Sequence, residues 1–232
     1  MHIPPHLVNE HFDDRYFDVV NAIQEARLIY IHGAGIAQRF PGTGASTEHF
    51  GIGETGFGAG RLLITLLDYL DTCGAENLSI TYTSVELYPI TALRMNSILS
   101  EFRPVVGPLI DLLVKKYGEL DIARSGWHEL SIQRQFGTLT LKLYIGEALE
   151  MIKSLTAPCD AWFLDGHGPK KNPAIWRHEL LMAVGEKTRP GGTVATYTVA
   201  GDVRRSLASA GFVVEKTAGF GGKKSVLKGV RV

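Results

Sequence analysis

The chain has 232 residues, of which 45% are hydrophobic and 21% are charged, and its formal net charge is zero. This composition is typical of a soluble globular protein that buries a substantial core. Its two cysteines, Cys73 and Cys159, show no CxxC spacing, which argues against a disulfide framework and a structural zinc site. No apolar run approaches the roughly 18 residues of a membrane helix, and the first residues show no targeting pattern. We therefore expect a cytoplasmic protein without a membrane partner.

Strand-like and helix-like segments alternate along the sequence. The expected strands cover residues 49–54, 78–86, 128–136, 138–146, 160–165, 191–199, 212–217 and 224–232. The expected helices cover residues 61–73, 89–102, 109–120, 173–188 and 202–211. Pro89 is expected in the first turn of its helix, where a missing N–H costs nothing.

This alternation predicts an α/β fold whose mainly parallel sheet is covered on both faces. Two strand-like runs around Gly137 predict an antiparallel pair, and the last two strands predict an antiparallel edge at the C-terminus. We expect residues 1–232 to form a single domain, with an N-terminal cover segment at 1–45 and a helical insertion at about 103–127.

The first motif is the Gly-rich turn "GETGFGAG", which lies between an expected strand and an expected helix. Ligands of such sheets bind at the carboxyl ends of the strands. Glycines let a ligand approach the backbone, and the helix start offers free N–H groups. The spacing is GxGxG rather than the GxGxxG of dinucleotide folds, and a tight turn without a ligand stays open.

Acidic residues follow three further strands. Glu86 ends the second strand, where a carboxylate suits a ribose diol, although acids are also common at solvated sheet edges. Glu147 follows the strand that ends near Ile145. Asp165 ends the apolar run "DAWFL", and a buried acid is costly unless it has a partner.

A glycine turn and then three acids, each after a successive strand, resemble the class I S-adenosylmethionine-dependent methyltransferases. The resemblance implies S-adenosyl-L-methionine as the cofactor. It implies that the ribose of the cofactor binds Glu86, that the adenine lies near Glu147 and that the transferred methyl group lies near Asp165. The methionine part would lie at the Gly-rich turn, which contributes Glu54, Gly56, Phe57, Gly58 and Gly60. No GKS or GKT lysine is present to meet the phosphates of a nucleoside diphosphate.

Five segments narrow the resemblance further. In order, they are "EHFDDRYFD", "IGETGFGAG", "DAWFLDGHGPKKNPAIW", "GGTVATYTVAGDVRRSLASAGF" and "EKTAGFGGKKSVLKGV". Together they are similar to the methyltransferase part of the MnmC family, which forms 5-methylaminomethyl-2-thiouridine at the tRNA wobble position. This implies a tRNA methyltransferase whose partner is the anticodon stem-loop. We expect it to lack the family's flavin-dependent domain, so that 5-aminomethyluridine must be supplied to it.

The chain departs from the family at several positions near these motifs. His167 and Gly168 stand where Phe-Ala is usual, and Ala59, Arg61 and Leu62 stand where Thr and then Leu-Asn are usual. His167 is either a substrate contact or an ordinary turn residue. These departures bear on the choice of substrate more than on the cofactor.

Asp165 is the candidate catalytic residue. The acceptor would be an amine that is mostly protonated at neutral pH, and only its neutral form has a lone pair for attack. A carboxylate at a partly dry strand end could attract the ammonium, accept its hydrogen bonds and aim the lone pair once a proton has left. Tyr197 is either a side wall for the uracil ring or core packing.

The charges divide unevenly along the chain. Residues 1–165 carry 12 Lys and Arg against 20 Asp and Glu, whereas residues 166–232 carry 12 against 4. The basic part is a candidate for tRNA phosphates, although it could simply neutralise the acidic part. The predicted substrate contacts are Gly166, His167, Pro169, Lys170, Lys171, Tyr197, Arg204, Lys223 and Lys224, with Arg177 and Arg205 as further phosphate candidates.

Three other functions remain open at this stage. Aminopropyltransferases share the fold and an amine acceptor, but the bases after Asp165 favour an anionic substrate over a polyamine. A methyltransferase of another amine acceptor and a non-catalytic RNA- or adenosyl-binding module are the alternatives. The eight histidines show no HExxH or grouped metal spacing, so no metal is expected.

Overall fold

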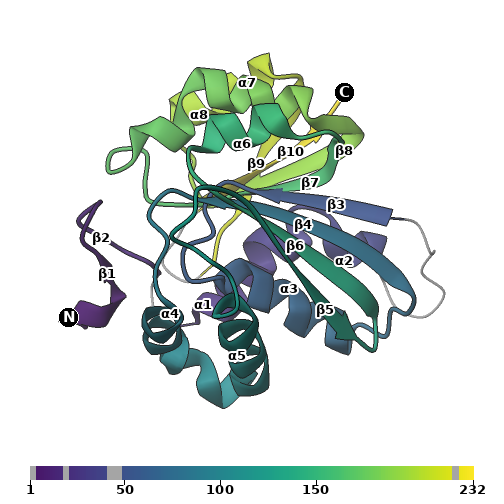
Figure 1. Ribbon diagram of the computed structural model, residues 1–232. Helices are drawn as coiled ribbons and strands as arrows, with labels where there is room; N and C mark the ends of the chain where they lie inside the picture. Colours follow the sequence, from purple (N-terminus) through teal and green to yellow (C-terminus); the bar gives the residue numbers. More distant parts are fainter. Residues whose placement is uncertain (1–3, 18–20, 41–48, 221–224) are drawn as a thin grey trace.

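One eight-stranded sheet organises the chain. We describe a computed structural model at residues 4–17, 21–40, 49–220 and 225–232 (Figure 1). The sheet order is β5-β6-β4-β3-β7-β8-β10-β9, and a separate two-stranded sheet pairs β1 with β2. The strands are β1 Val8–Asn9, β2 Asp14–Arg15, β3 His49–Glu54, β4 Leu78–Glu86, β5 Gly126–Arg134, β6 Gly137–Ile145, β7 Cys159–Leu164, β8 Thr188–Thr196, β9 Phe212–Ala218 and β10 Ser225–Arg231.

Helices cover both faces of this sheet. Figure 1 shows α6, α7 and α8 on one face and α1 to α5 on the other. The α-helices are α1 Ala22–Ala26, α2 Ile36–Arg39, α3 Arg61–Thr72, α4 Ala92–Leu99, α5 Arg103–Tyr117, α6 Ala148–Ser154, α7 His178–Glu186 and α8 Gly201–Ser209. Shorter turns are η1 Pro5–Leu7, the π-helical η2 Arg27–His32, η3 Ser100–Phe102 and η4 Pro173–Trp176.

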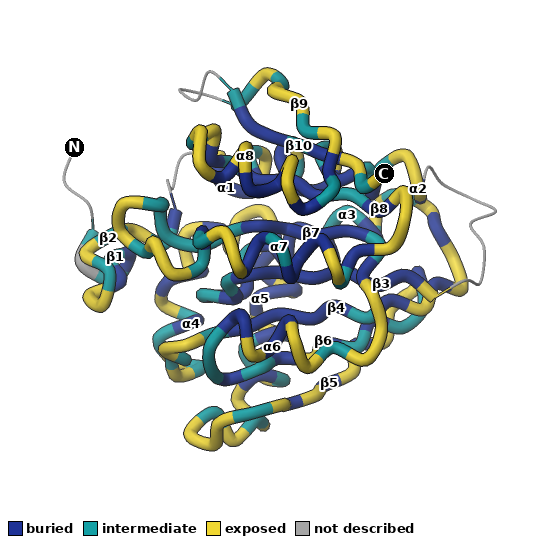
Figure 2. Tube along the Cα trace, turned by 90° about the horizontal axis from the view of Figure 1, so that it is seen from above, coloured by how far each residue is buried: buried dark blue, intermediate teal, exposed yellow. Residues whose placement is uncertain are grey.

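Strand β7 shows why the sequences of the central strands are continuous runs of apolar residues. Ala161 and Phe163 pack into the core beneath α1 to α5, whereas Trp162 and Leu164 pack into the core beneath α6 to α8. Successive side chains point to opposite faces, so a strand with two covered faces has no polar side. Figure 2 shows the buried residues concentrated along these central strands.

The predicted fold class is confirmed by the pairing of the strands. Strands β6, β4, β3, β7 and β8 run parallel to one another, whereas β5 pairs antiparallel with β6. Strand β10 pairs antiparallel with both β8 and β9, as the C-terminal edge was expected to do. None of the helices in the described residues is long and apolar enough to cross a membrane.

Three expected helices have other bounds than the sequence suggests. Helix α4 begins at Ala92 with Thr91 as its N-cap, so Pro89 precedes the helix. The helix expected at 173–188 is divided into η4 and α7 because Arg177 between them is extended. Helix α5 begins at Arg103, ahead of the expected 109–120, and it is kinked at Val106, just before Pro108. A proline within a helix removes a hydrogen bond and crowds the preceding turn.

Candidate active site

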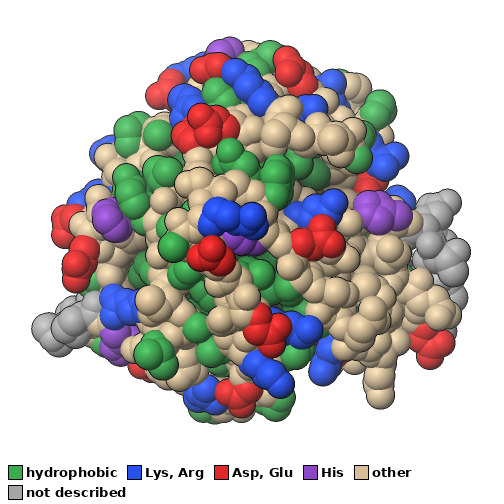
Figure 3. Space-filling model, viewed as in Figure 1, with side chains coloured by type: hydrophobic (Ala, Val, Ile, Leu, Met, Phe, Trp, Pro, Cys, Tyr) green, Lys and Arg blue, Asp and Glu red, His purple; other side chains and the backbone are tan. Residues whose placement is uncertain are grey.

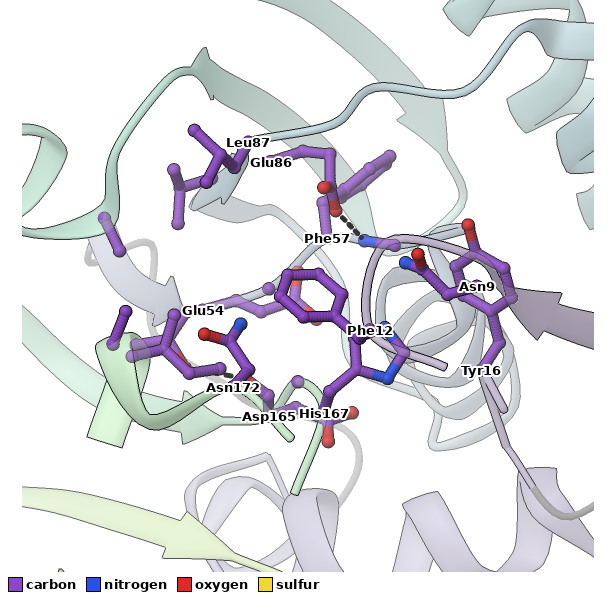
Figure 4. Close-up of a pocket in the computed structure, with 18 of the residues that line it drawn as sticks. Asn9, Phe12, Tyr16, Glu54, Phe57, Glu86, Leu87, Asp165, His167 and Asn172 are labelled. Atoms are coloured by element: carbon purple, nitrogen blue, oxygen red, sulfur yellow. Dashed lines mark hydrogen bonds between the residues drawn. The ribbon is translucent and has the colours of Figure 1, made fainter. Parts of the chain in front are cut away.

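The carboxyl ends of β3, β4 and β7 open into a cavity of about 350 Å³ (Figure 4). Its size is within the range of pockets that hold cofactors. The winding direction reverses at β3, because β4 lies on one side of it and β7 on the other. The predicted site residues that line the cavity are Glu54, Gly56, Phe57, Gly58, Glu86, Glu147, Asp165, Gly166 and His167.

The Gly-rich turn brings the backbone to the edge of the cavity. Gly58 and Gly60 have φ angles of 54° and 77°, in the left-handed region that favours glycine. A Cβ on Gly60 would lie 2.7 Å from Leu113 Cδ2, so this glycine is required by the packing of α3 against α5. Gly60 is the N-cap of α3 and does not line the cavity, unlike Gly56 and Gly58.

Glu54 is a buried acid with one oxygen that lacks a partner. Its residue is 1% exposed, and Ser84 Oγ donates a hydrogen bond of 2.6 Å to Oε2. Oε1 has no hydrogen-bond partner among the described residues. Burial raises the pKa of this carboxyl to about 8, and the Ser84 hydrogen bond opposes the shift. A cationic donor that enters the cavity would satisfy Oε1 and favour the ionised form.

The carboxylate of Glu86 accepts hydrogen bonds from the Gly-rich turn and from the segment just after β4, beside the cavity. Gly58 N donates 2.8 Å to Oε2, drawn dashed in Figure 4, and Tyr88 N donates 2.9 Å to Oε1. Burial raises the pKa of Glu86, while these backbone donors lower it. A carboxylate has about four lone-pair positions, so Glu86 can still accept hydrogen bonds from a diol.

Glu147 lines the cavity, but its carboxylate is already bound. Oε2 accepts hydrogen bonds from Leu149 N at 2.9 Å and Glu150 N at 3.2 Å, which makes Glu147 the N-cap of α6. Arg177 donates to Oε1 at 2.9 Å. Arg177 therefore lies at the cavity wall, where the sequence suggested only a phosphate contact.

Asp165 has a partner that the sequence analysis did not assign. Arg61 Nη2 lies 3.0 Å from Asp165 Oδ2, and the two side chains are only 12% and 17% exposed. The backbone around Asp165 is also held, because Thr55 Oγ1 donates to its carbonyl at 2.9 Å. Gly166 follows with φ 134°, and a Cβ there would lie 2.3 Å from Ile175 Cδ1. In the sequence, the departure from the family pattern at Arg61 was the feature that could have indicated this contact.

His167 connects this turn to the N-terminal hairpin. Its Nδ1 lies 3.4 Å from Asp14 Oδ2, and the centroid of its ring lies 4.6 Å from that of Phe12. Figure 4 shows His167 and Phe12 beside each other at the cavity. Burial lowers the pKa of His167, and the carboxylate of Asp14 opposes the shift. Phe12, Tyr16 and Asp14 belong to the segment quoted for the resemblance, and Phe12 and Tyr16 line the cavity.

Several other predicted substrate residues lie outside the cavity lining. Tyr197 donates a hydrogen bond of 2.9 Å to Gly166 O and contacts Trp176 edge-on, so it supports the turn after Asp165. Lys171 pairs with Asp13 at 2.8 Å. Arg205 pairs with Asp202 on α8. Pro169, Lys170 and Arg204 do not line the cavity either, and Lys223 and Lys224 lie outside the described residues.

Figure 3, viewed as Figure 1, shows acidic and basic side chains interspersed on the face of the molecule that points toward the viewer. Two of the predicted basic contacts, Lys171 and Arg177, are already in ion pairs with Asp13 and Glu147. The charge excess of residues 166–232 therefore partly neutralises the acidic N-terminal part within the folded unit.

Comparison with known proteins identifies the family. The profile of a family described as S-adenosyl-L-methionine-dependent methyltransferase matches residues 113–232. The chain belongs to this family. Its cofactor is S-adenosyl-L-methionine, as the resemblance to class I methyltransferases implied.

Two curated relatives are similar over most of this methyltransferase. It is 36% identical over 221 residues to the "tRNA 5-methylaminomethyl-2-thiouridine biosynthesis bifunctional protein MnmC" of Pseudomonas fluorescens. It is 34% identical over 218 residues to the protein of the same name from Chromobacterium violaceum. Each match covers 94% of this chain but only 32% of the relative. The chain thus spans about a third of the length of these relatives, and the resemblance to the MnmC methyltransferase part is confirmed.

A solved structure shares the fold. The crystal structure of MnmC2 from Aquifex aeolicus matches with a TM-score of 0.75 and 21% identity, over 96% of this chain and 65% of that one. At this identity the likeness concerns the arrangement of strands and helices. It agrees with the class I methyltransferase architecture expected from the sequence.

Proposed function

We propose that this methyltransferase transfers a methyl group to the amine of 5-aminomethyluridine, with or without a 2-thio group, at the wobble position of tRNA. The observation that carries the proposal is the 36% identity, over 94% of this chain, to a protein named for 5-methylaminomethyl-2-thiouridine biosynthesis. The partner would be the anticodon stem-loop.

The cavity fits the cofactor. S-adenosyl-L-methionine carries an ammonium group. Oε1 of Glu54, which has no partner within the described part of the chain, is a buried acceptor that such a donor would satisfy. Glu86, at the end of β4, would accept hydrogen bonds from the ribose diol. The carboxylate of Glu147 is bound to α6 and Arg177, so we place the adenine beside the backbone at 146–148.

Asp165 would orient the acceptor amine. The cofactor supplies an electrophilic methyl group on a sulfonium. The neutral amine nitrogen forms a bond to the methyl carbon while the carbon–sulfur bond breaks, and the new secondary ammonium then loses a proton. Asp165 would accept a hydrogen bond from the amine and fix the direction of its lone pair. Thr55 and Tyr197 support this role, because they hold the backbone carbonyls of Asp165 and Gly166.

The direct test is transfer of labelled methyl to two tRNA preparations, followed by nucleoside analysis. One preparation carries 5-aminomethyluridine and the other carries the carboxymethylaminomethyl group. We expect methylation of the first alone. Absence of transfer to either, with the cofactor still bound, would refute the proposed acceptor and favour a methyltransferase of another amine.

Glu86→Gln is expected to weaken S-adenosyl-L-methionine binding about 10- to 100-fold, because it removes the charge from a carboxylate that accepts from the ribose. Methylthioadenosine has the ribose but not the amino-acid part, so its affinity should fall by the same factor. Isothermal titration of both ligands measures this. Unchanged affinity for methylthioadenosine would show that the ribose lies elsewhere.

Lys170→Glu is expected to weaken tRNA binding and to reduce the slope of log affinity against log salt by about 1 to 2. Lys170 is exposed, and no ion-pair partner for it is found among the described residues, in contrast to Lys171. The matched control is Lys216→Glu on the edge strand β9, which should leave the slope unchanged. Equal slopes for all three proteins, measured by filter binding, would place the RNA surface elsewhere.

We propose also that residues 1–232 form one domain, with a cover at 1–45 and a helical insertion at about 103–127. All strands from His49 to Arg231 join one sheet, which supports this division. Phe17 of the cover packs against Phe102 at 4.8 Å between ring centroids. Limited proteolysis should yield no stable fragment lacking either end of the sheet, and recovery of one would contradict the proposal.

A further inference from the structure

The ion pair between Arg61 and Asp165 lies in the wall of the active-site cavity. Its N···O distance is 3.0 Å, and both side chains are largely shielded from solvent. Both residues line the cavity. The carboxylate proposed to meet the acceptor amine is therefore already neutralised by a cation before any substrate enters.

Arg61 is also held by contacts other than Asp165. Its Nη1 donates to Ala22 O of α1 at 3.0 Å, and its guanidinium carbon lies 5.9 Å from the centre of the Phe17 ring. Arg61 is also the first residue of α3, directly after the Gly-rich turn. These contacts hold the positive charge beside Asp165 and prevent it from simply moving aside.

We propose that Arg61 is a positioning residue that makes the cavity select the neutral form of the acceptor amine. The inference rests on the proposed function, because it requires an amine acceptor beside Asp165. A lone carboxylate would bind the ammonium form as an ion pair, and that form has no lone pair for attack. With Arg61 in place, an ammonium gains little from Asp165 and is repelled by the guanidinium, whereas a neutral amine can still donate a hydrogen bond to the carboxylate.

The other titratable groups around the pair do not supply a replacement cation. Those that interact with Asp165 or Arg61 are Glu54 from β3, Tyr82 from β4, Tyr30 from η2, Tyr197 after β8 and His167 after β7, while Asp14 from β2 faces His167 and Tyr197. Burial raises the pKa of each of these tyrosines, so they stay neutral. Burial lowers the pKa of His167, which is therefore uncharged near neutral pH. Without Arg61, the carboxylates of Asp165 and of nearby Asp14 would favour the ammonium form.

The test compares wild type with Arg61→Gln, Arg61→Lys and a control, Arg134→Gln. Arg134, on the edge strand β5, forms an ion pair of 2.6 Å with Asp71 of α3. Neither residue lines the cavity. The turnover number and KM for tRNA carrying 5-aminomethyluridine are measured between pH 6.5 and 9.5 with saturating cofactor.

Arg61→Gln is expected to lower the turnover number about tenfold or more at pH 7, because an uncompensated carboxylate raises the pKa of a nearby amine by one unit or more. Its KM should stay equal or fall, and the difference from wild type should shrink as the pH rises to 9.5. Arg61→Lys keeps the charge and should keep the wild-type profile. Arg134→Gln should change neither turnover nor profile. A loss in Arg61→Gln that is constant over this pH range, or a lysine variant no better than the glutamine one, would overturn the inference.

A binding measurement on the wild type covers the case in which Arg61→Gln does not fold. The affinity for tRNA carrying 5-aminomethyluridine, relative to tRNA with unmodified uridine at the same position, should rise with pH if the neutral amine is selected. A fall with pH would show selection of the ammonium and refute the role of Arg61. Failure of the wild type to methylate this tRNA at any pH would instead refute the proposed function, and the inference with it.

Discussion

Asp165→Asn is expected to reduce methyl transfer about 100-fold or more while cofactor affinity changes little. An amide can still fill the space beside Arg61, but it has no charge and a weaker acceptor for the amine. Misplacing a reacting group by about 1 Å can already cost a factor of about 10². Single-turnover transfer to tRNA carrying 5-aminomethyluridine, together with titration of the cofactor, separates the two effects.

The same substitution affects stability, and this must be separated from catalysis. Replacing Asp165 leaves the shielded guanidinium of Arg61 without a counter-charge, which should cost about 1 to 3 kcal/mol of the free energy of unfolding. The double variant Asp165→Asn with Arg61→Leu removes both charges, so it should regain most of this stability in urea unfolding. Its transfer activity should remain low. Recovery of activity in the double variant would show that Asp165 matters only for folding.

Much of the fold follows from local patterns. Runs such as "DAWFL" are too short and too apolar for a surface helix, and the structure buries alternate residues of β7 in two different cores. The bounds of helices were less predictable. Pro89 fits a first turn, but Thr91 caps α4 by accepting a hydrogen bond from Arg94 N at 3.2 Å, and this competing signal determines where the helix begins.

The part of the site predicted best comes from the strand ends. Glu54, Glu86 and Asp165 each end or follow a parallel strand, and the carboxyl ends of neighbouring parallel strands meet at one edge of the sheet. The pairing of Arg61 with Asp165 was not predictable in this way. It joins residues that are distant in sequence, and it depends on the rotation of α3 about its axis and on the fixed turn after β7.

The N-terminal contacts show the same limit. Asp14 reaches His167 only because the β1–β2 hairpin folds back over the end of β7. Nothing in the local pattern of "FDDRYFD" specifies that distant partner. The sequence therefore predicted which residues surround the cavity better than it predicted which of them pair.

Glu54→Gln is expected to weaken S-adenosyl-L-methionine binding about 10- to 100-fold and to leave methylthioadenosine binding nearly unchanged. The reason is the buried carboxylate, whose Oε1 has no hydrogen-bond partner among the residues that the structure describes and would accept from an ammonium donor. Glutamine keeps the shape and an oxygen acceptor for Ser84 but carries no charge. This pattern is the reverse of that expected for Glu86→Gln, which should weaken both ligands equally. Equal losses for both ligands in Glu54→Gln would contradict the assignment of Glu54 to the amino-acid end.

The raised pKa of Glu54 also predicts how the cofactor-free protein responds to pH. The carboxyl has a pKa of about 8 in the folded protein and an ordinary value of 4.5, so between these values the folded state binds the extra proton. Stability must then fall as the pH rises through this window, and it levels off above about 8. Glu54→Gln removes this slope and should raise the free energy of unfolding at pH 7.5 by on the order of 3 kcal/mol.

Cofactor binding draws on the same proton. An ammonium donor beside Oε1 favours the carboxylate, so binding near pH 7 should release a proton, and affinity should increase from pH 6 to 7.5 in the wild type only. Calorimetry in buffers of different ionisation enthalpy measures that release directly. We expect Glu54→Gln to bind the cofactor less tightly and yet to be more stable against unfolding. If the variant lost both stability and cofactor affinity, the fold itself would hold Glu54 ionised. Glu54 would then not be reserved for the cofactor.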